Sequence, residues 1–356
     1  MNKLTLRAGR EAYDKIKRDG FTPDMITGVV AAAGGPKWFT TYGLVRFIIG
    51  DFLKDATHKM DFLGASVGSW QMTAAMTSDP REAIDRLQRA YATTTYSDDP
   101  TEKEISLACQ RMIEDVILDE TDYILSHPSR SLQVVTARGK GLLSHTNQIL
   151  RGMGFGAAFI SNIVSRKHMA KAVDRIIFKT KGELMYRADL DILPTREVEL
   201  TAQNLVPALR ASGTIPYMME AIKDIPKAPP GHYWDGGLTD YHISLPFKRD
   251  GIVLHPHFLS TVLSGWFDKK LPWNRNADEN LMSKVLLLTP SEDYIKSLPR
   301  KQISDMKDFQ YYGKDQDKRI AYWSEISKRS LELGEELSEL ISTGNICEQI
   351  QPYTRN

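Results

Sequence analysis

A continuous apolar run from Met25 to Ala33 places the strongest constraint on the fold. Pro23 precedes the run, Gly34-Gly35 follows it, and it contains no charged residue. A short apolar segment between turn residues is typical of a strand that is buried on both faces of a sheet. Residues 39–54 follow with helical spacing, so the chain opens with a strand and then a helix.

The alternation continues along the chain. Residues 59–63 resemble a strand, a helix is expected from Ser69, and another from about 81 to 94. Alternating strands and helices predict an α/β sheet with helices on both faces. Further expected helices are 8–19, 101–127, 204–212 and 315–342, and further expected strands are 131–137, 183–187 (the weaker candidate), 252–254 and 285–289. We expect one domain over residues 1–290 and a helical C-terminal extension, 291–356, packed on it.

Composition narrows the functional classes. The formal net charge of +1 over 356 residues gives no general attraction to nucleic acid. The two cysteines, Cys109 and Cys347, are too few for a disulfide framework or a cysteine-based metal site. The N-terminus has no apolar signal segment, and no run of about 18 apolar residues predicts a membrane span. We therefore expect a cytoplasmic protein that binds no nucleic acid.

The pentapeptide Gly64-Ala65-Ser66-Val67-Gly68 is the main candidate for chemistry. It has the form G-x-S-x-G between a predicted strand and a predicted helix. In a nucleophile elbow this sharp turn exposes the serine hydroxyl, and the glycines keep side chains away from it. A serine needs a base to take its proton, so Ser66 is a candidate nucleophile that requires a partner.

Three further segments could complete such a site. Gly34-Gly35-Pro36-Lys37 ends the first predicted strand, and backbone N–H groups of such glycines can form an oxyanion hole. Residues 211–217 read A-S-G-T-I-P-Y, and Asp235-Gly236-Gly237 holds a carboxylate in a turn. Taken alone, Asp235 could equally begin an ordinary β-turn.

In this order the motifs resemble the patatin-like phospholipase family, over roughly residues 25–247. The resemblance implies a three-layer α/β/α fold with a mostly parallel central sheet and a Ser66-Asp235 dyad without histidine. Gly34, Gly35 and Val67 would supply the oxyanion hole, and Lys37 keeps the family's basic position as a candidate anion contact. The implied activity is serine-dependent hydrolysis of lipid esters or phospholipids through an acyl-enzyme, with no metal and no organic cofactor.

The glycine-rich segment departs from the family pattern. Ala32, Ala33 and Trp38 stand where the family usually has aspartate, glycine and glycine. Backbone N–H donors do not depend on side-chain identity, so the oxyanion hole can survive these changes. We expect Trp38 to narrow or cover the cleft.

Two other functions remain open. His255 and His257 follow a predicted strand late in the chain, as the histidine of an α/β-hydrolase triad would. His232, three residues before Asp235, could orient the catalytic loop. The second alternative is a non-catalytic relative that keeps the fold and binds lipid or a partner.

Residues 138–181 carry many basic residues and, within that stretch, only Asp174 as an acid. They enclose the apolar segment 152–160, rich in glycine. Such a segment could be a flexible lid or a peripheral contact with an anionic membrane surface. A solvated basic face beside a buried helix is the alternative.

Overall fold

The computed structural model describes residues 2–145, 147–271, 273 and 275–354. Within them eleven strands join one sheet, whose main path runs β11-β1-β10-β9-β2-β3-β4-β5-β6, with β8 on β4 and β7 on β8. The strands are β1 Leu4–Ala8, β2 Ile26–Ala31, β3 Met60–Ala65, β4 Arg130–Gly139, β5 Val173–Lys179, β6 Thr195–Glu199, β7 Ile222–Lys223, β8 His232–Asp235, β9 Ile252–Pro256, β10 Val285–Pro290 and β11 Gln351–Pro352.

The α-helices are α1 Arg10–Asp19, α2 Tyr42–Phe47, α3 Val67–Ala74, α4 Pro80–Thr93, α5 Glu102–Ile117, α6 Thr121–Ser126, α7 Gln148–Val164, α8 Leu205–Ser212, α9 Glu292–Ser297, α10 Lys307–Tyr312, α11 Gln316–Ser342 and α12 Ile346–Gln349. The central strands β10, β9, β2, β3 and β4 run parallel to one another. The chain therefore has the expected α/β structure with a mostly parallel central sheet, compatible with three layers.

The two faces of the sheet are covered differently. Consecutive residues of a strand point to opposite faces, and Phe62 joins one hydrophobic cluster while its neighbour Leu63 joins the other. The first cluster includes residues of α2, α3, α4, α5 and α11. The second face is covered largely by non-helical segments, among them Leu184–Tyr186 and Tyr241–Phe247. The alternation of strands and helices predicted helices on both faces of the sheet, whereas the helices named here cover mainly one face.

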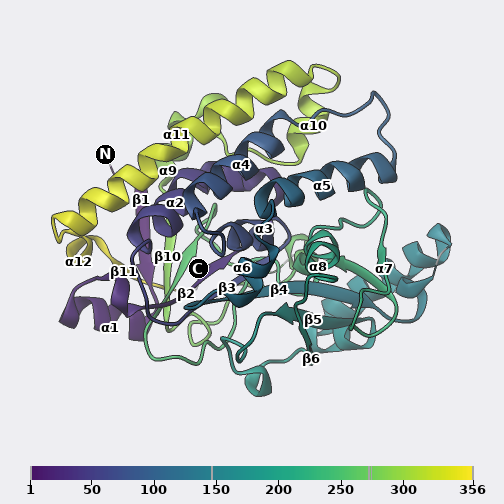
Figure 1. Cartoon of the computed structure of the whole chain (residues 1–356), viewed down its shortest axis with the longest axis horizontal. Helices are drawn as coiled ribbons and strands as arrows, with labels where there is room; N and C mark the ends of the chain where they lie inside the picture. The colour runs from purple at the N-terminus through teal and green to yellow at the C-terminus, as the bar shows by residue number, and fades with distance from the viewer. Residues whose placement is uncertain (1, 146, 272, 274, 355–356) are drawn as a thin grey trace.

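The C-terminal segment is tied to the start of the fold. Figure 1 shows α11 as a long helix along one edge of the molecule, over α2 and α4. The helices approach closely because Gly43 has no side chain: a Cβ there would lie 2.2 Å from the carbonyl oxygen of Ser330. The Gly43 N–H donates to the hydroxyl of Ser330 at 2.9 Å. The predicted helix 315–342 is confirmed, whereas the domain boundary at 290 stays a prediction.

Several local predictions were wrong. The helix expected over 101–127 is interrupted after Ile117 by Leu118, which has a positive φ of 47°, and α6 begins at Thr121. Residues 39–54 are largely helical, as predicted, but change from a 3₁₀ segment to α2 and then to a π-turn. Residues 183–187 form no strand but only an isolated bridge from Tyr186 to Phe247. Strands β1, β5 and β6 and helix α7 were not predicted.

Candidate active site

The G-x-S-x-G segment is a sharp turn between β3 and α3, as predicted. Ser66 has φ 56° and ψ −134°, a backbone conformation that is strained for a residue with a side chain. Gly64 and Gly68 make the turn feasible, since a Cβ on Gly64 would lie 2.4 Å from the Gly68 carbonyl carbon and one on Gly68 would lie 2.1 Å from the Ala31 oxygen. The strand–turn–helix geometry of a nucleophile elbow is therefore present.

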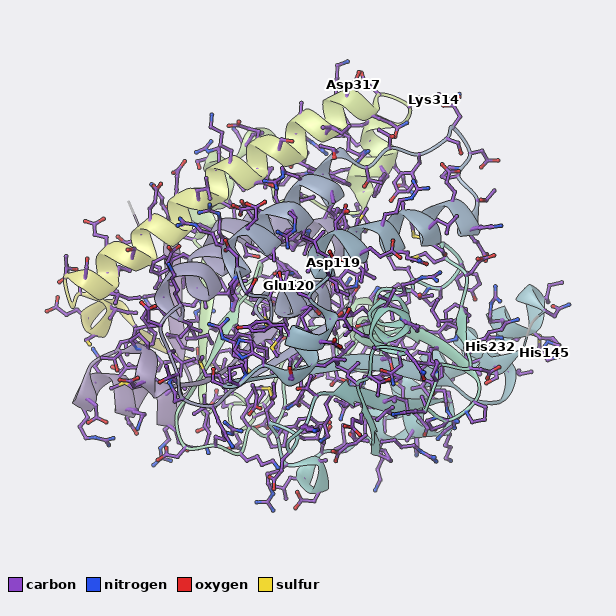
Figure 2. The ribbon with its side chains drawn as sticks, in the orientation of Figure 1. Asp119, Glu120, His145, His232, Lys314 and Asp317 are labelled. Atoms are coloured by element: carbon purple, nitrogen blue, oxygen red, sulfur yellow. The ribbon has the colours of Figure 1, made fainter. Side chains whose placement is uncertain are left out.

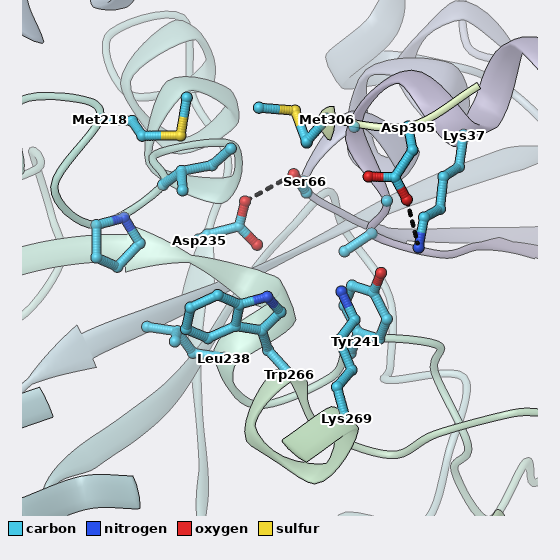
Figure 3. Close-up of a pocket in the computed structure, with 15 residues that line it drawn as sticks. Lys37, Ser66, Met218, Asp235, Leu238, Tyr241, Trp266, Lys269, Asp305 and Met306 are labelled. Atoms are coloured by element: carbon cyan, nitrogen blue, oxygen red, sulfur yellow. Dashed lines mark hydrogen bonds and ion pairs between the residues drawn. The ribbon is translucent and has the colours of Figure 1, made fainter. Parts of the chain in front are cut away.

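Ser66 and Asp235 are in direct contact. The Ser66 hydroxyl donates to Oδ2 of Asp235 at 2.7 Å, drawn as a dashed line in Figure 3. Asp235 ends β8, which pairs antiparallel with β4 opposite Thr136. Its other carboxyl oxygen, Oδ1, accepts the N–H of Gly237 at 2.7 Å. The carboxylate is thus held at both oxygens, with one directed at the serine.

The segment 211–217 connects the two residues. The Ser66 N–H donates to the hydroxyl of Ser212 at 2.9 Å, and that hydroxyl donates to the Val135 carbonyl at 2.7 Å. The N–H of Asp235 donates to the Thr214 carbonyl at 2.9 Å. This segment therefore fixes the backbone of both Ser66 and Asp235, which gives the A-S-G-T-I-P-Y sequence a structural role.

The surroundings make Asp235 a stronger base than a free carboxylate. Burial raises the pKa of Asp235 to about 6, against the hydrogen bonds from Ser66 and Gly237 and the positive charge of Lys269, which lower it. A carboxylate with a pKa nearer neutrality accepts a proton more readily while remaining ionised at pH 7. This property suits a general base.

The residues predicted for the oxyanion hole lie around Ser66. Gly34 and Gly35 line a pocket of about 270 Å³ together with Ser66 and Asp235. Val67 lines a second pocket with Ser66. Gly35 and Val67 begin helical segments, where N–H groups have no partner within the helix. A side chain at Gly34 would force Phe258 to shift, because a Cβ would lie 2.6 Å from its ring.

Trp38 does not cover the cleft, so that expectation was wrong. Its side chain is 1% exposed and packs in the core against the rings of Phe39 and Tyr42. The helical turn that follows Gly35 directs it inward, away from the pocket. Lys37 does line the pocket, but its ammonium lies 3.3 Å from a carboxyl oxygen of Asp305. Its charge is already paired.

Two pockets of different character meet at Ser66. The 270 Å³ pocket contains the polar side chains of Lys37, Tyr241, Lys269 and Asp305, with Trp266 also in its wall. The second, about 180 Å³, is lined almost entirely by apolar and aromatic side chains, among them Trp70, Tyr91, Tyr96, Cys109, Met219 and Phe309. Gly35, Ser66, Ile215, Met218 and Met306 belong to both.

The sequence reasoning missed the residues that enter the site from after position 260. Lys269 belongs to the 3₁₀ segment Trp266–Lys270, and Asp305 and Met306 precede α10. No motif marks any of them. The segment before α10 is anchored by Ser304, whose hydroxyl donates to the Pro36 carbonyl at 2.6 Å. The predicted C-terminal extension therefore supplies part of the pocket wall.

The histidines do not join Ser66. His255 and His257 are fully buried, and neither lines either of the two pockets. Burial lowers the pKa of both, that of His257 to about 4. His232 begins β8, at the opposite end of the strand from Asp235. Figure 2 shows it beside the loop of His145, at the end of the molecule where α7 lies. Within the part of the chain that the structure describes, the Ser66 hydroxyl therefore binds Asp235 and no histidine.

Most of the basic residues over 138–181 are paired inside the protein. Arg138 and Lys140 both bind Asp174. Arg175 binds Asp240 through two hydrogen bonds of 2.7 Å. The partners of Arg166, Arg175 and Lys179 lie after residue 181, namely Asp191, Glu197, Asp240 and Asp268. The expected basic surface is therefore reduced mainly to Lys167, Lys171 and Lys181, which are exposed.

The apolar segment 152–160 is not a flexible loop. It lies within α7. Gly154 permits close packing there, since a Cβ would lie 2.9 Å from the Leu143 backbone nitrogen.

No family model matches the chain, and neither the curated proteins nor the solved structures gave a match. Among the described residues, no group of histidine, cysteine and acidic side chains is arranged to hold a metal ion. None of the described helices is both long and apolar enough to cross a membrane.

Proposed function

We propose that this protein is a serine-dependent acyl hydrolase of lipid esters, with a patatin-like fold and a Ser66-Asp235 dyad. The observation that carries the proposal is the 2.7 Å hydrogen bond between the two side chains, formed at a strained elbow. The apolar pocket that opens on the same serine supports a lipid acyl group. Because the histidines lie elsewhere, the dyad is favoured over a triad.

The reaction proceeds in two balanced steps. As Ser66 Oγ attacks the ester carbonyl carbon, Asp235 accepts the serine proton, and the oxyanion binds the N–H groups of Gly34, Gly35 and Val67. Collapse of the tetrahedral intermediate breaks the ester C–O bond, and Asp235 returns the proton to the leaving alcohol. Water then attacks the acyl-enzyme, Asp235 takes its proton, and the acid leaves as the proton returns to Ser66.

A fluorophosphonate probe tests the dyad. The wild type should be labelled, Ser66→Ala should lose all labelling, and Asp235→Asn should be labelled at least about a hundredfold more slowly because the base is gone. Ser342→Ala and Asp317→Asn, on the exposed side of α11, are matched controls that should label normally. Absence of labelling in the wild type would favour a non-catalytic lipid-binding protein, and labelling of Ser66→Ala would contradict the assignment.

Helix α7 has an exposed apolar face and packs near the site with its other face. Four exposed apolar residues follow one face of α7 at spacings of four and seven: Ile149, Met153, Ile160 and Val164. On the inner face of α7, Phe155 contacts Tyr217, and Phe159 contacts Phe267, the neighbour of the pocket residue Trp266. We infer that α7 lies on the lipid surface beside the pocket, with Lys167 and Lys171 near anionic headgroups.

Vesicle binding tests this contact. A Met153→Glu/Ile160→Glu variant should bind phosphatidylcholine–phosphatidylglycerol vesicles at least about tenfold more weakly, because two charges would enter the apolar boundary. Leu190→Glu changes an exposed apolar residue outside α7 and is the matched control. Equal binding by both variants and the wild type would exclude α7 as the contact.

A further inference from the structure

We propose that the two pockets at Ser66 bind different parts of one substrate. The acyl chain enters the apolar pocket, and Lys269 binds an anionic group on the alcohol portion. This inference rests on the proposed function and names the substrate class within it. The preferred ester would carry a phosphate or a carboxylate on the part that leaves first. Neutral esters with the same acyl chain would be poorer substrates.

The apolar pocket fits the acyl side. Its deep wall is built from Trp70 and Met219 together with the aromatic rings of Tyr91 and Phe309. Cys109 also lies there, and burial raises the pKa of its thiol to about 12, which keeps it neutral. A wall of this composition favours hydrocarbon and disfavours a charged alcohol. The alcohol portion is therefore directed to the other pocket.

Lys269 is a lysine of that other pocket with no ion pair among the described residues. Its ammonium lies 3.8 Å from the centre of the Tyr241 ring, and it forms no ion pair with any carboxylate of the described residues. Lys37, by contrast, is paired with Asp305. In Figure 3 the two lysine side chains reach the same side of the pocket beside Tyr241, across from the dyad. An anion that enters there could bind Lys269 without displacing a carboxylate from it.

The charged groups that act on Lys269 are Lys37, Asp305 and Asp235. The side chain is exposed to solvent through the open pocket, yet the surrounding protein crowds its ammonium. Desolvation of the ammonium, together with the positive charge of Lys37, lowers the pKa of Lys269 to about 7, against Asp305 and Asp235, which raise it. A bound anion would stabilise the protonated lysine, so binding of the anion and protonation of Lys269 favour each other.

The segment that carries Lys269 is firmly held. The neighbouring Asp268 is buried and accepts hydrogen bonds from Asn162 of α7 at 2.8 Å, from the Gly265 N–H at 2.9 Å and from Arg275 at 3.1 Å. Arg166 lies 3.9 Å from the same carboxylate. The backbone that carries Lys269 is therefore held in place relative to Ser66, which is what selection among substrates requires.

The test compares three octanoyl esters, those of glycerol phosphate, glyceric acid and glycerol, which differ in the charge of the alcohol. In Lys269→Gln the ratio of kcat/KM for each anionic ester to that for the neutral ester should fall about tenfold or more, the value of one charged hydrogen bond. Lys269→Arg should restore the ratio. Lys314→Gln, a surface lysine far along the chain, should leave the ratio unchanged. Comparison of the phosphate and carboxylate esters identifies the preferred anion.

The pH profile provides a second readout. For the wild type, the ratio of anionic to neutral ester kcat/KM should fall above pH 7 as Lys269 loses its proton, and Lys269→Arg should remove this decline. If Lys269→Gln lowers kcat/KM equally for all three esters, the lysine supports the catalytic dyad and does not bind an anion, and the proposal is wrong. Fluorophosphonate labelling of the wild type separates the two questions, since labelling with unchanged selectivity would overturn only the anion site.

Discussion

Replacing Asp235 with asparagine should stabilise the protein at neutral pH while removing its base. Burial and its other surroundings raise the pKa of this carboxyl from 3.8 to about 6, so the folded state disfavours the charged form by about 3 kcal/mol. An asparagine side chain carries no charge and can still accept the Gly237 N–H while donating to Ser66. The variant should therefore regain up to about 3 kcal/mol at pH 8.

The pH dependence fixes the sign of this effect. Since the pKa of Asp235 is higher in the folded than in the unfolded protein, the folded state retains a proton between about pH 4 and 6 that the unfolded state has lost. The contribution of Asp235 to wild-type stability consequently falls as pH rises through that window and is level above it. The advantage of Asp235→Asn should be complete at pH 8, roughly half as large at pH 5, and absent below about pH 4.

Thermal unfolding measures the difference. With an unfolding entropy of about 2.1 cal/mol/K per residue, ~3 kcal/mol raises the Tm of 356 residues by about 4 °C. Asp174→Asn is a control of opposite sign: burial would raise the pKa of Asp174, but Lys140 and Arg138 outweigh it and lower the pKa. That variant should lose stability at pH 8. Equal Tm values for wild type and Asp235→Asn at pH 8, or a gain independent of pH, would refute the reasoning.

Further outcomes follow from the same contacts. Hydrolysis of a neutral ester should increase as pH rises through about 6, where Asp235 loses its proton, and a kcat/KM that is flat from pH 5 to 8 would contradict its role as base. Ser212→Ala leaves the buried Ser66 N–H without its acceptor, so fluorophosphonate labelling should slow about tenfold, as measured by competitive labelling against wild type. Cys109→Phe fills the apolar pocket and should shift the preference toward shorter acyl chains in a chain-length series. Acid should destabilise the fold below about pH 6.5, because burial lowers the pKa of His242 and His255 and unfolding lets them bind protons; urea midpoints between pH 5 and 7 test this.

The parts of the site that sequence could predict are those built from backbone geometry. Gly64, Gly68 and Gly34 are each required where another backbone or ring approaches within 3 Å of the absent Cβ. The contact between Gly64 and Gly68 acts over four residues and leaves a readable spacing, whereas Gly68 meets Ala31 and Gly34 meets Phe258 across the fold. The contact between Ser66 and Asp235 joins residues 169 positions apart in the sequence, and it was anticipated only because the motif order resembled a known family.

The parts that could not be predicted depend on long-range pairing. The local excess of basic residues suggested a charged surface, but Arg175 binds Asp240, which lies far along the chain. Lys269 and Asp305 likewise enter the pocket from segments whose own sequence is unremarkable. Electrostatic character at a site is set by which distant segments meet there, and counting charges within a window does not reveal this.

The altered glycine-rich segment and the C-terminal segment are structurally connected. Trp38 stands where the resembled family usually has glycine, and its ring packs inward against Tyr42 and Tyr91. The same segment is held from the C-terminal side by Ser304, which binds the Pro36 carbonyl, while Met306 lies against Gly35, 3.0 Å from where a Cβ would be. A loop with fewer glycines has fewer conformations to lose on ordering. We infer that Trp38 and the 304–306 segment together hold the N–H groups of Gly34 and Gly35 in place, a task that extra glycines alone do not perform.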